Sequence, residues 1–341
     1  MTQSATPTVH PPLRRVADGI YALRLPLPFA LNHVNCYLLQ DGDGGGWTIV
    51  DAGLNRPEVR EAWLGAWAEL QIAPQQIRQV VLTHMHPDHF GLAGWLQEQS
   101  GAPVLLSPRE AEVARVTWME ELTAEREAAV QRYMHSAGVT PDVAEVILSQ
   151  QAHLRSLTYP HPRRIDTLAP GAVIEMGGRR FTAIHAPGHA DGQLVFYCAD
   201  DRLLLCGDQV MQRITPNIGV WPTTEPSPLA RYLRSLAELA ALEVDLALPG
   251  HYAPLTDWRG RIAELQAHHD QRLEAMYAAA QAGATALEVS YAVFDYDRFS
   301  QHEVRFAVAE ALAHLEHLAE QGRLQRIDTA AGRKYSAPHC A

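Results

Sequence analysis

Four side chains of types that bind metals lie within six consecutive residues of this chain. His84, His86, Asp88 and His89 directly follow an apolar run at residues 77–82 and lead into a segment with helical spacing. In an extended turn, the histidines of a His-x-His pair project to one side, and Asp88 and His89 can approach from the start of the helix. Imidazole nitrogens combined with carboxylate oxygens suit zinc, manganese or iron rather than copper(I) or calcium. The motif therefore predicts a divalent metal site at a strand-to-helix junction.

Three further residues of ligand type stand at the ends of other apolar runs. His189 follows FTAIHAPG, Asp208 follows LLLCG and His251 follows LALPG, so a glycine precedes each of them. Loops gather at strand ends, and glycine permits the tight backbone path that such an approach needs. Three such residues after three separate predicted strands reinforce the prediction of a metal site.

Strand and helix patterns indicate the scaffold that must position these motifs. Short β-like runs separated by turns occupy residues 19–50, and strand patterns return between residues 165 and 251. Helical spacing is predicted at 57–70, 88–101 and 230–242. Residues 109–165 differ in kind, because their Glu-, Ala- and Arg-rich composition predicts two or three helices inserted between strand units.

The chain beyond residue 255 has another pattern. Helices are predicted at 258–282, 284–294 and 300–321, followed by two short β-like runs around the turn TAAG. This order of three helices and a hairpin is typical of a winged-helix module. The sequence therefore predicts one domain at residues 1–255 and a small, mostly helical, winged-helix-like domain at residues 256–341.

Composition and charge exclude several classes of protein. The chain has 341 residues, of which 47% are hydrophobic and 20% charged, and its net charge is −11. These values are typical of a globular protein and disfavour broad electrostatic capture of nucleic acid or anionic membranes. No apolar run is long enough for a membrane span, the N-terminus lacks the apolar core of a secretory signal, and the cysteines form no C-x-x-C pair. We therefore expect a cytoplasmic protein.

Taken together, the motifs resemble those of the metallo-β-lactamase superfamily of hydrolases. The resemblance extends from about Gly19 to His251, and Asp51 in VDAG supplies the first of its five motifs. It implies an α+β fold in which an αββα sandwich carries a two-metal site at one edge. It also implies a role for each ligand: His84, His86 and His189 would hold one ion, Asp88, His89 and His251 the other, Asp208 would bridge them, and Asp51 would orient a ligand histidine.

The ligand set also predicts the chemistry. Two cations, zinc or alternatively iron or manganese, would lower the pKa of a shared water towards roughly 7, so that hydroxide is available at neutral pH. Asp88 and Asp208 are the carboxylates expected to take part in catalysis. Asp88 argues against a true β-lactamase, because antibiotic-cleaving members commonly depart from the pattern there. The full set resembles that of hydroxyacylglutathione hydrolases, lactonases, thioesterases and RNA-processing members.

The C-terminal part resembles the winged-helix tail of the lactamase-like subgroup. That subgroup usually has a second glycine after the last motif histidine, whereas this chain has Tyr252. Tyr252 is therefore either a substrate contact or a packing residue.

Two substrate classes stay open. An ester, thioester or lactone of a small or acyl substrate is favoured by the acidic chain and by apolar side chains of the insert. These side chains either cover an apolar pocket or only pack the insert onto the sandwich. The predicted substrate contacts are Trp118, Tyr133, Trp221 and Tyr252.

The alternative is a phosphodiester of nucleic acid. However, residues 256–341 carry nine basic and twelve acidic side chains, and the helix at 301–321 has Arg305 against four glutamates. A surface that tracks phosphates should be basic. We therefore interpret the C-terminal part as a structural cap or a homodimerisation element.

Overall fold

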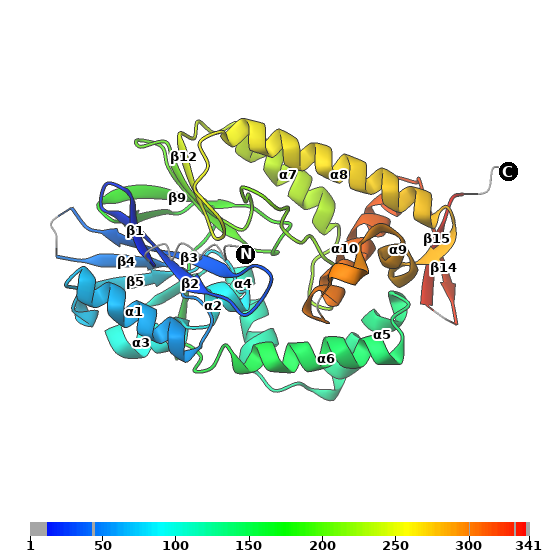
Figure 1. Ribbon diagram of the computed structural model, residues 1–341, viewed down its shortest axis with the longest axis horizontal. Helices are drawn as coiled ribbons and strands as arrows, with labels where there is room; N and C mark the ends of the chain where they lie inside the picture. The colour runs from blue at the N-terminus through cyan, green and yellow to red at the C-terminus, as the bar shows by residue number, and fades with distance from the viewer. Residues whose placement is uncertain (1–11, 43–44, 300, 331, 339–341) are drawn as a thin grey trace, which may run out of the picture.

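Two β-sheets packed face to face, with helices on both outer sides, form the larger part of the molecule (Figure 1). The computed structural model describes residues 12–42, 45–299, 301–330 and 332–338. The predicted αββα sandwich is confirmed. In the view of Figure 1, the sandwich lies on the left and the C-terminal helices on the right.

The first sheet has seven strands in sequential order. They are β1 (Leu13–Ala17), β2 (Ile20–Pro26), β3 (His33–Gln40), β4 (Trp47–Val50), β5 (Ile77–Val81), β6 (Val104–Leu106) and β7 (Ile165–Thr167). Strands β1 to β4 pair antiparallel, and β4 to β7 pair parallel. Helix α1 (Pro57–Glu69) and the 3-10 turn Pro74–Gln76 connect β4 to β5, and α2 (Pro87–Phe90) and α3 (Ala93–Ser100) connect β5 to β6.

The second sheet has five strands in the order β12-β11-β10-β9-β8. They are β8 (Val173–Met176), β9 (Arg179–His185), β10 (Leu194–Cys198), β11 (Leu203–Gly207) and β12 (Leu246–Pro249). Strands β8 to β11 pair antiparallel, whereas β11 and β12 pair parallel through a crossover made by α7 (Pro228–Ala240). Long central strands such as β3 are buried on both faces, as expected for a sheet covered on both sides.

Separate apolar layers hold the sandwich together. Between the sheets, Val50 and Val81 of the first pack with Phe181 and Phe196 of the second. On the outer side of the first sheet, α1 and α3 bury a tryptophan cluster that includes Trp67. Such burial removes these aromatic side chains from water and fixes the strand ends that carry the predicted ligands.

The insert is helical, as its composition predicts. It consists of α4 (Pro108–Ala114), a π-helical turn (Arg115–Met119), α5 (Ala124–Ser136) and α6 (Pro141–Ser156). In Figure 1, α5 and α6 lie beside the C-terminal helices rather than over the strands. Val130 and Met134 of α5 share one continuous core with Tyr232 of α7 and Leu315 of the C-terminal part.

The C-terminal part contains α8 (Trp258–Ala280), α9 (Ala286–Val293), a 3-10 turn (Tyr296–Arg298) and α10 (Gln301–Glu320). Its strands β13 (Ala282–Thr285), β14 (Gln325–Thr329) and β15 (Gly332–Ser336) form a sheet in the order β13-β15-β14. Strand β13 is not predicted by the sequence, and the predicted helix at 284–294 begins only at Ala286. The reason is that Ala284 and Thr285 pair with β15, and the Thr285 side chain caps α9.

Among the described residues, none of the helices combines the length and the hydropathy that a transmembrane span requires.

Candidate metal centre

All seven predicted ligands follow the C-terminal ends of strands, and the fold brings them to one edge of the sandwich. His84, His86, Asp88 and His89 lie between β5 and the end of α2. His189, Asp208 and His251 follow β9, β11 and β12 respectively. Three overlapping clusters have donor atoms within 4.8 Å of one another: His84, His86 and His189; His84, His89 and Asp208; and Asp88, His89 and His251.

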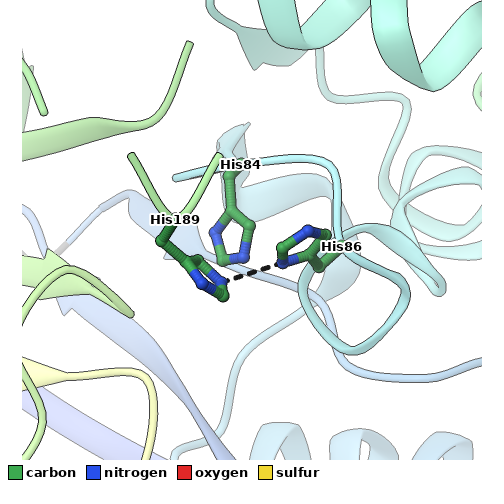
Figure 2. Close-up of side chains that lie close together, drawn as sticks. All are labelled: His84, His86 and His189. Atoms are coloured by element: carbon green, nitrogen blue, oxygen red, sulfur yellow. Dashed lines mark hydrogen bonds between the residues drawn. The ribbon is translucent and has the colours of Figure 1, made fainter. Parts of the chain in front are cut away.

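The first set is a triangle of imidazoles (Figure 2). His86 Nδ1 and His189 Nε2 lie 2.9 Å apart. His189 Nδ1 donates to the backbone oxygen of Asn217, also at 2.9 Å, so its Nε2 is left with a free lone pair. Thr83 Oγ1 donates to Asp51 and lies 2.9 Å from His84 Nδ1, so it can accept the proton of that nitrogen. The remaining nitrogen of His84, Nε2, then also carries a lone pair.

Another set, made of Asp88, His89 and His251, combines two imidazoles and a carboxylate. His89 Nδ1 donates to Asp51 Oδ2 at 2.8 Å, and His251 Nδ1 donates to the backbone oxygen of His33 at 2.6 Å. Both Nε2 atoms therefore face the site, where they lie 3.9 and 3.4 Å from Asp88 Oδ2. The Nδ1 hydrogen bonds fix the ring orientations, as is usual for metal-binding histidines.

Asp208 lies between the two sets. Its Oδ1 is 3.3 Å from His89 Nε2, and its Oδ2 is 3.2 Å from His251 Nε2 and 3.6 Å from His189 Nε2. One carboxylate thus contacts histidines of both clusters, which is the position that a bridging ligand needs.

The donor set fits divalent cations. Among the described residues, the buried atoms His84 Nε2, His89 Nε2, Asp208 Oδ1 and His251 Nε2 have no hydrogen-bond partner. Leaving such atoms unsatisfied is costly, and native proteins rarely do so without reason. Two donors on one tetrahedral zinc ion lie about 3.3 Å apart, because each bond is about 2.0 Å long. The separations of 2.9–3.9 Å given above bracket that value.

The histidines of the site differ in their protonation state, because burial and neighbouring charges shift their pKa values in opposite directions. Burial holds the pKa of His84 and His189 below the usual range and lowers that of His86 to about 3, so these rings are neutral. Burial alone would also lower the pKa of His251. The nearby carboxylates, that of Asp208 above all, together have the larger, opposite effect, so the pKa of His251 is raised to about 10. Protons on such histidines balance the carboxylates, and binding of a cation would displace them.

Asp51 lies where the resemblance implies, beside a ligand histidine. Its carboxylate accepts from Thr83 N at 2.8 Å as well as from His89. Its backbone is left-handed, with φ of 62°, a strained conformation for a non-glycine residue. The buried hydrogen bonds of its carboxylate hold that conformation in place.

Two further residues position the site, and the motifs do not reveal them. Glu110 of α4 accepts from Met85 N at 2.8 Å and from Gly192 N at 2.7 Å, so it ties the His-x-His loop to the loop after β9. Burial raises the pKa of its carboxyl group to about 7. Asn217 fixes His189 and also donates to Glu310 of α10 at 3.3 Å.

A cavity of about 1000 Å³ opens onto the candidate metal centre. Its walls come from the insert, the loop at residues 211–224 and α10, together with site residues such as Asp88. All four predicted substrate contacts line it: Trp118, Tyr133, Trp221 and Tyr252. Trp118 is almost fully buried and donates to the backbone oxygen of Met85 at 2.8 Å, so it also supports the metal-binding loop.

Comparisons with known proteins agree with the geometry. Residues 30–251 match the Metallo-beta-lactamase superfamily, and residues 273–336 match the family described as Metallo-beta-lactamase-like, C-terminal domain. The probable metallo-hydrolase YqjP of Bacillus subtilis is 30% identical, over 70% of this chain and 73% of its own length. A hydroxyacylglutathione hydrolase of Pseudomonas paraeruginosa is 28% identical over 62% of this chain, and the matched region spans 59% of that enzyme.

A solved structure extends the similarity over both parts of the chain. The metallo-beta-lactamase family protein TTHA1429 of Thermus thermophilus is 35% identical, with a TM-score of 0.83. The alignment covers 95% of this chain and 100% of that protein.

Proposed function

Since this chain belongs to the metallo-beta-lactamase superfamily and is a metallo-hydrolase, we propose that it hydrolyses an ester, thioester or lactone that has an apolar body. The observation that carries this proposal is the mainly apolar cavity that opens directly onto the cluster of seven ligand-type side chains.

Two divalent cations are proposed as cofactors, zinc or alternatively iron or manganese. His84, His86 and His189 would hold one, Asp88, His89 and His251 the other, and Asp208 would bridge them, since it contacts both clusters. When bound, the cations would lower the pKa of water and polarise the scissile carbonyl group.

Two ionised carboxylates of this chain would orient groups in the site. The pKa values of Asp88 and Asp208 lie below the usual range because His89 and His251 outweigh the effect of burial, so both carboxylates are ionised at neutral pH. Asp88 has the more exposed side chain, at 18% against 8% for Asp208. Asp88 is therefore the carboxylate better placed to accept a hydrogen bond from a water in the cavity.

The apolar side chains of the insert support an acyl substrate. Val113, Val116, Leu122 and Val130 line the cavity and would contact a hydrocarbon chain or ring. Helix α10 argues against the nucleic-acid alternative. Its residues Val308, Ala311 and Leu315 are buried, so the helix packs within the molecule and does not present a basic face to a groove.

The test is a hydrolysis panel on protein loaded in turn with zinc, iron or manganese. The panel contains acyl thioesters, aryl esters, lactones, a bis-phosphodiester and a β-lactam. We expect turnover of at least one carboxylic ester class and none of the β-lactam. Turnover of the bis-phosphodiester alone would overturn the proposal, and an Asp208→Ala variant purified in parallel controls for contaminating hydrolases.

A further inference from the structure

One arginine of the C-terminal part faces the cavity beside the metal centre. Arg305 lies in the first turns of α10 and lines the cavity together with Asp88 and Tyr133. Its guanidinium carbon is 4.1 Å from the ring centroid of Phe306 and 5.7 Å from that of Trp221. The side chain is half-buried, held against aromatic rings but open on the cavity side. Cation–π contacts of this kind fix the plane of a guanidinium group while leaving its edge donors available.

Arg305 has no carboxylate at ion-pairing distance among the described residues. Within the ranges that the structure describes, Arg305 forms no ion pair and no hydrogen bond, and its Nε is buried and unsatisfied. Other arginines of the C-terminal part differ in this respect. Arg323 binds Glu274 through two nitrogens, and Arg326 and Arg333 both pair with Glu316.

An unpaired cation in such a place is unfavourable until an anion joins it. Burying a charge without a counter-charge is unfavourable, and a bound carboxylate or phosphate would offset that cost. Burial lowers the pKa of Arg305 to about 10, and the attraction of Asp88 offsets only part of this effect. The side chain therefore stays charged at neutral pH, in the cavity that Asp88 also lines.

The positive charge of Arg305 stands in a protein whose overall charge is negative. With a net charge of −11, the protein has no general attraction for anions. The cavity walls are mainly apolar, and burial raises the pKa values of Glu110 and Glu310 in them to about 7. The cavity is also lined by Glu121, Asp191 and Glu303. A substrate with an anionic end would find its complement in Arg305, whereas a wholly apolar substrate would leave the guanidinium unpaired.

We propose that Arg305 is a specificity-determining residue that binds an anionic group of the substrate, a carboxylate or a phosphate. The apolar body of the same molecule would lie along the cavity, and its ester or thioester group would reach the metal centre. The planar guanidinium would bind either anion through two parallel hydrogen bonds. This inference rests on the proposed hydrolase function and names the class of substrate within it.

The first test compares matched eight-carbon acyl thioesters on the metal-loaded enzyme. One is neutral, one carries a carboxylate at the end of the acyl chain, and two carry a carboxylate or a phosphate on the leaving thiol. We expect at least one anionic thioester to exceed the neutral one in kcat/KM by roughly 10- to 100-fold, the range for a hydrogen-bonded charge. Which of the anionic thioesters is preferred distinguishes carboxylate from phosphate.

Substitution assigns that preference to one side chain. Arg305→Gln should abolish it, with kcat/KM for the neutral thioester and the bound metal changed by less than about threefold. Arg305→Lys should retain part of it, because the charge remains but the two-point geometry is lost. Arg155→Gln, which alters another arginine lining the same cavity, is the matched control and should keep the preference. Equal preference in the wild type and Arg305→Gln would overturn the inference, as would its loss in Arg155→Gln alone.

A second readout does not depend on turnover. Calorimetric titration of the metal-loaded protein with octyl phosphate and with octanoate should give a dissociation constant roughly 10-fold or more higher in Arg305→Gln than in the wild type. Unchanged binding of both amphiphiles would contradict the role of Arg305. If no ester or thioester is cleaved yet the variant binds these anions more weakly, the proposed hydrolysis fails while the anion site stands.

Discussion

The metal centre and the cavity above it are built in different ways. The seven ligand-type side chains come from loops at the ends of sandwich strands, and hydrogen bonds fix their rings, such as that of His89 to Asp51. The cavity walls come from the insert, the loop at 211–224 and α10, and their apolar side chains are held mainly by packing. If the proposed function holds, the sandwich would determine the reaction, while the segments added to it would determine which molecule reacts. Substitutions in the two regions should therefore have different consequences.

The largest effect is expected in the metal centre. Asp208→Ala removes the carboxylate that contacts both clusters, so turnover should fall by roughly 1,000-fold or more and bound metal should decrease. Steady-state kinetics and elemental analysis measure the two quantities. Asp245→Ala, which alters an exposed aspartate before β12, should change neither. Full activity with undiminished metal in Asp208→Ala would show that the cluster is not the reaction centre.

A smaller effect is expected one step away from the ligands. Asp51→Asn removes the charge that orients His89, and loss of such a supporting group typically weakens metal affinity by about 10- to 100-fold. Competition with a chromogenic chelator measures this affinity. Asp166→Asn, on the surface at β7, serves as the control. An affinity unchanged in Asp51→Asn would mean that a neutral amide oxygen orients the His89 ring as well as the carboxylate does.

Glu110 joins the two regions, and its loss should affect stability. Glu110→Ala leaves the buried N–H groups of Met85 and Gly192 without their acceptor, which should lower the free energy of unfolding by about 1–3 kcal/mol. Glu110→Gln keeps the shape and one acceptor oxygen and should lose less. Denaturant unfolding of both variants measures the difference, and equal stability of Glu110→Ala and the wild type would contradict the bridging role.

The smallest effect on catalysis is expected in the cavity wall. Tyr133→Ala should shift the ratio of kcat/KM between long and short acyl substrates by about 10-fold while leaving metal content unchanged. Tyr291→Ala, which alters an exposed tyrosine outside the cavity, should leave the ratio unchanged. A ratio unaffected by Tyr133→Ala would assign that residue to packing alone and would weaken the distinction between the two regions.

The sequence predicts the two regions unequally. The ligands stand in short motifs after apolar runs, so the placement of His84 or Asp208 at strand ends follows from local pattern. The sandwich follows from the family resemblance that these motifs carry. Glu110 is one acidic residue in a Glu- and Arg-rich segment, and Asn217 acts through its backbone oxygen, so neither gives a local signal. Arg305 appears in the sequence as a single cation among glutamates. Its unpaired position at the cavity depends on contacts between segments that are more than 80 residues apart, which periodicity does not encode.

The C-terminal part shows the same limit. Three helices and a hairpin follow from helical spacing and turn residues, whereas β13 forms only because β15, about 50 residues later, offers its edge. Its four residues, AGAT, have no alternation of apolar and polar side chains that would predict a strand.

The central claim is that the seven side chains hold two cations at one edge of the sandwich. Anomalous X-ray diffraction from crystals of zinc-loaded protein tests it most directly. We predict two ions per chain, one bound by His84, His86 and His189 and the other by Asp88, His89 and His251, with Asp208 touching both. A single ion, or ions bound elsewhere under zinc-saturated conditions, would contradict the account.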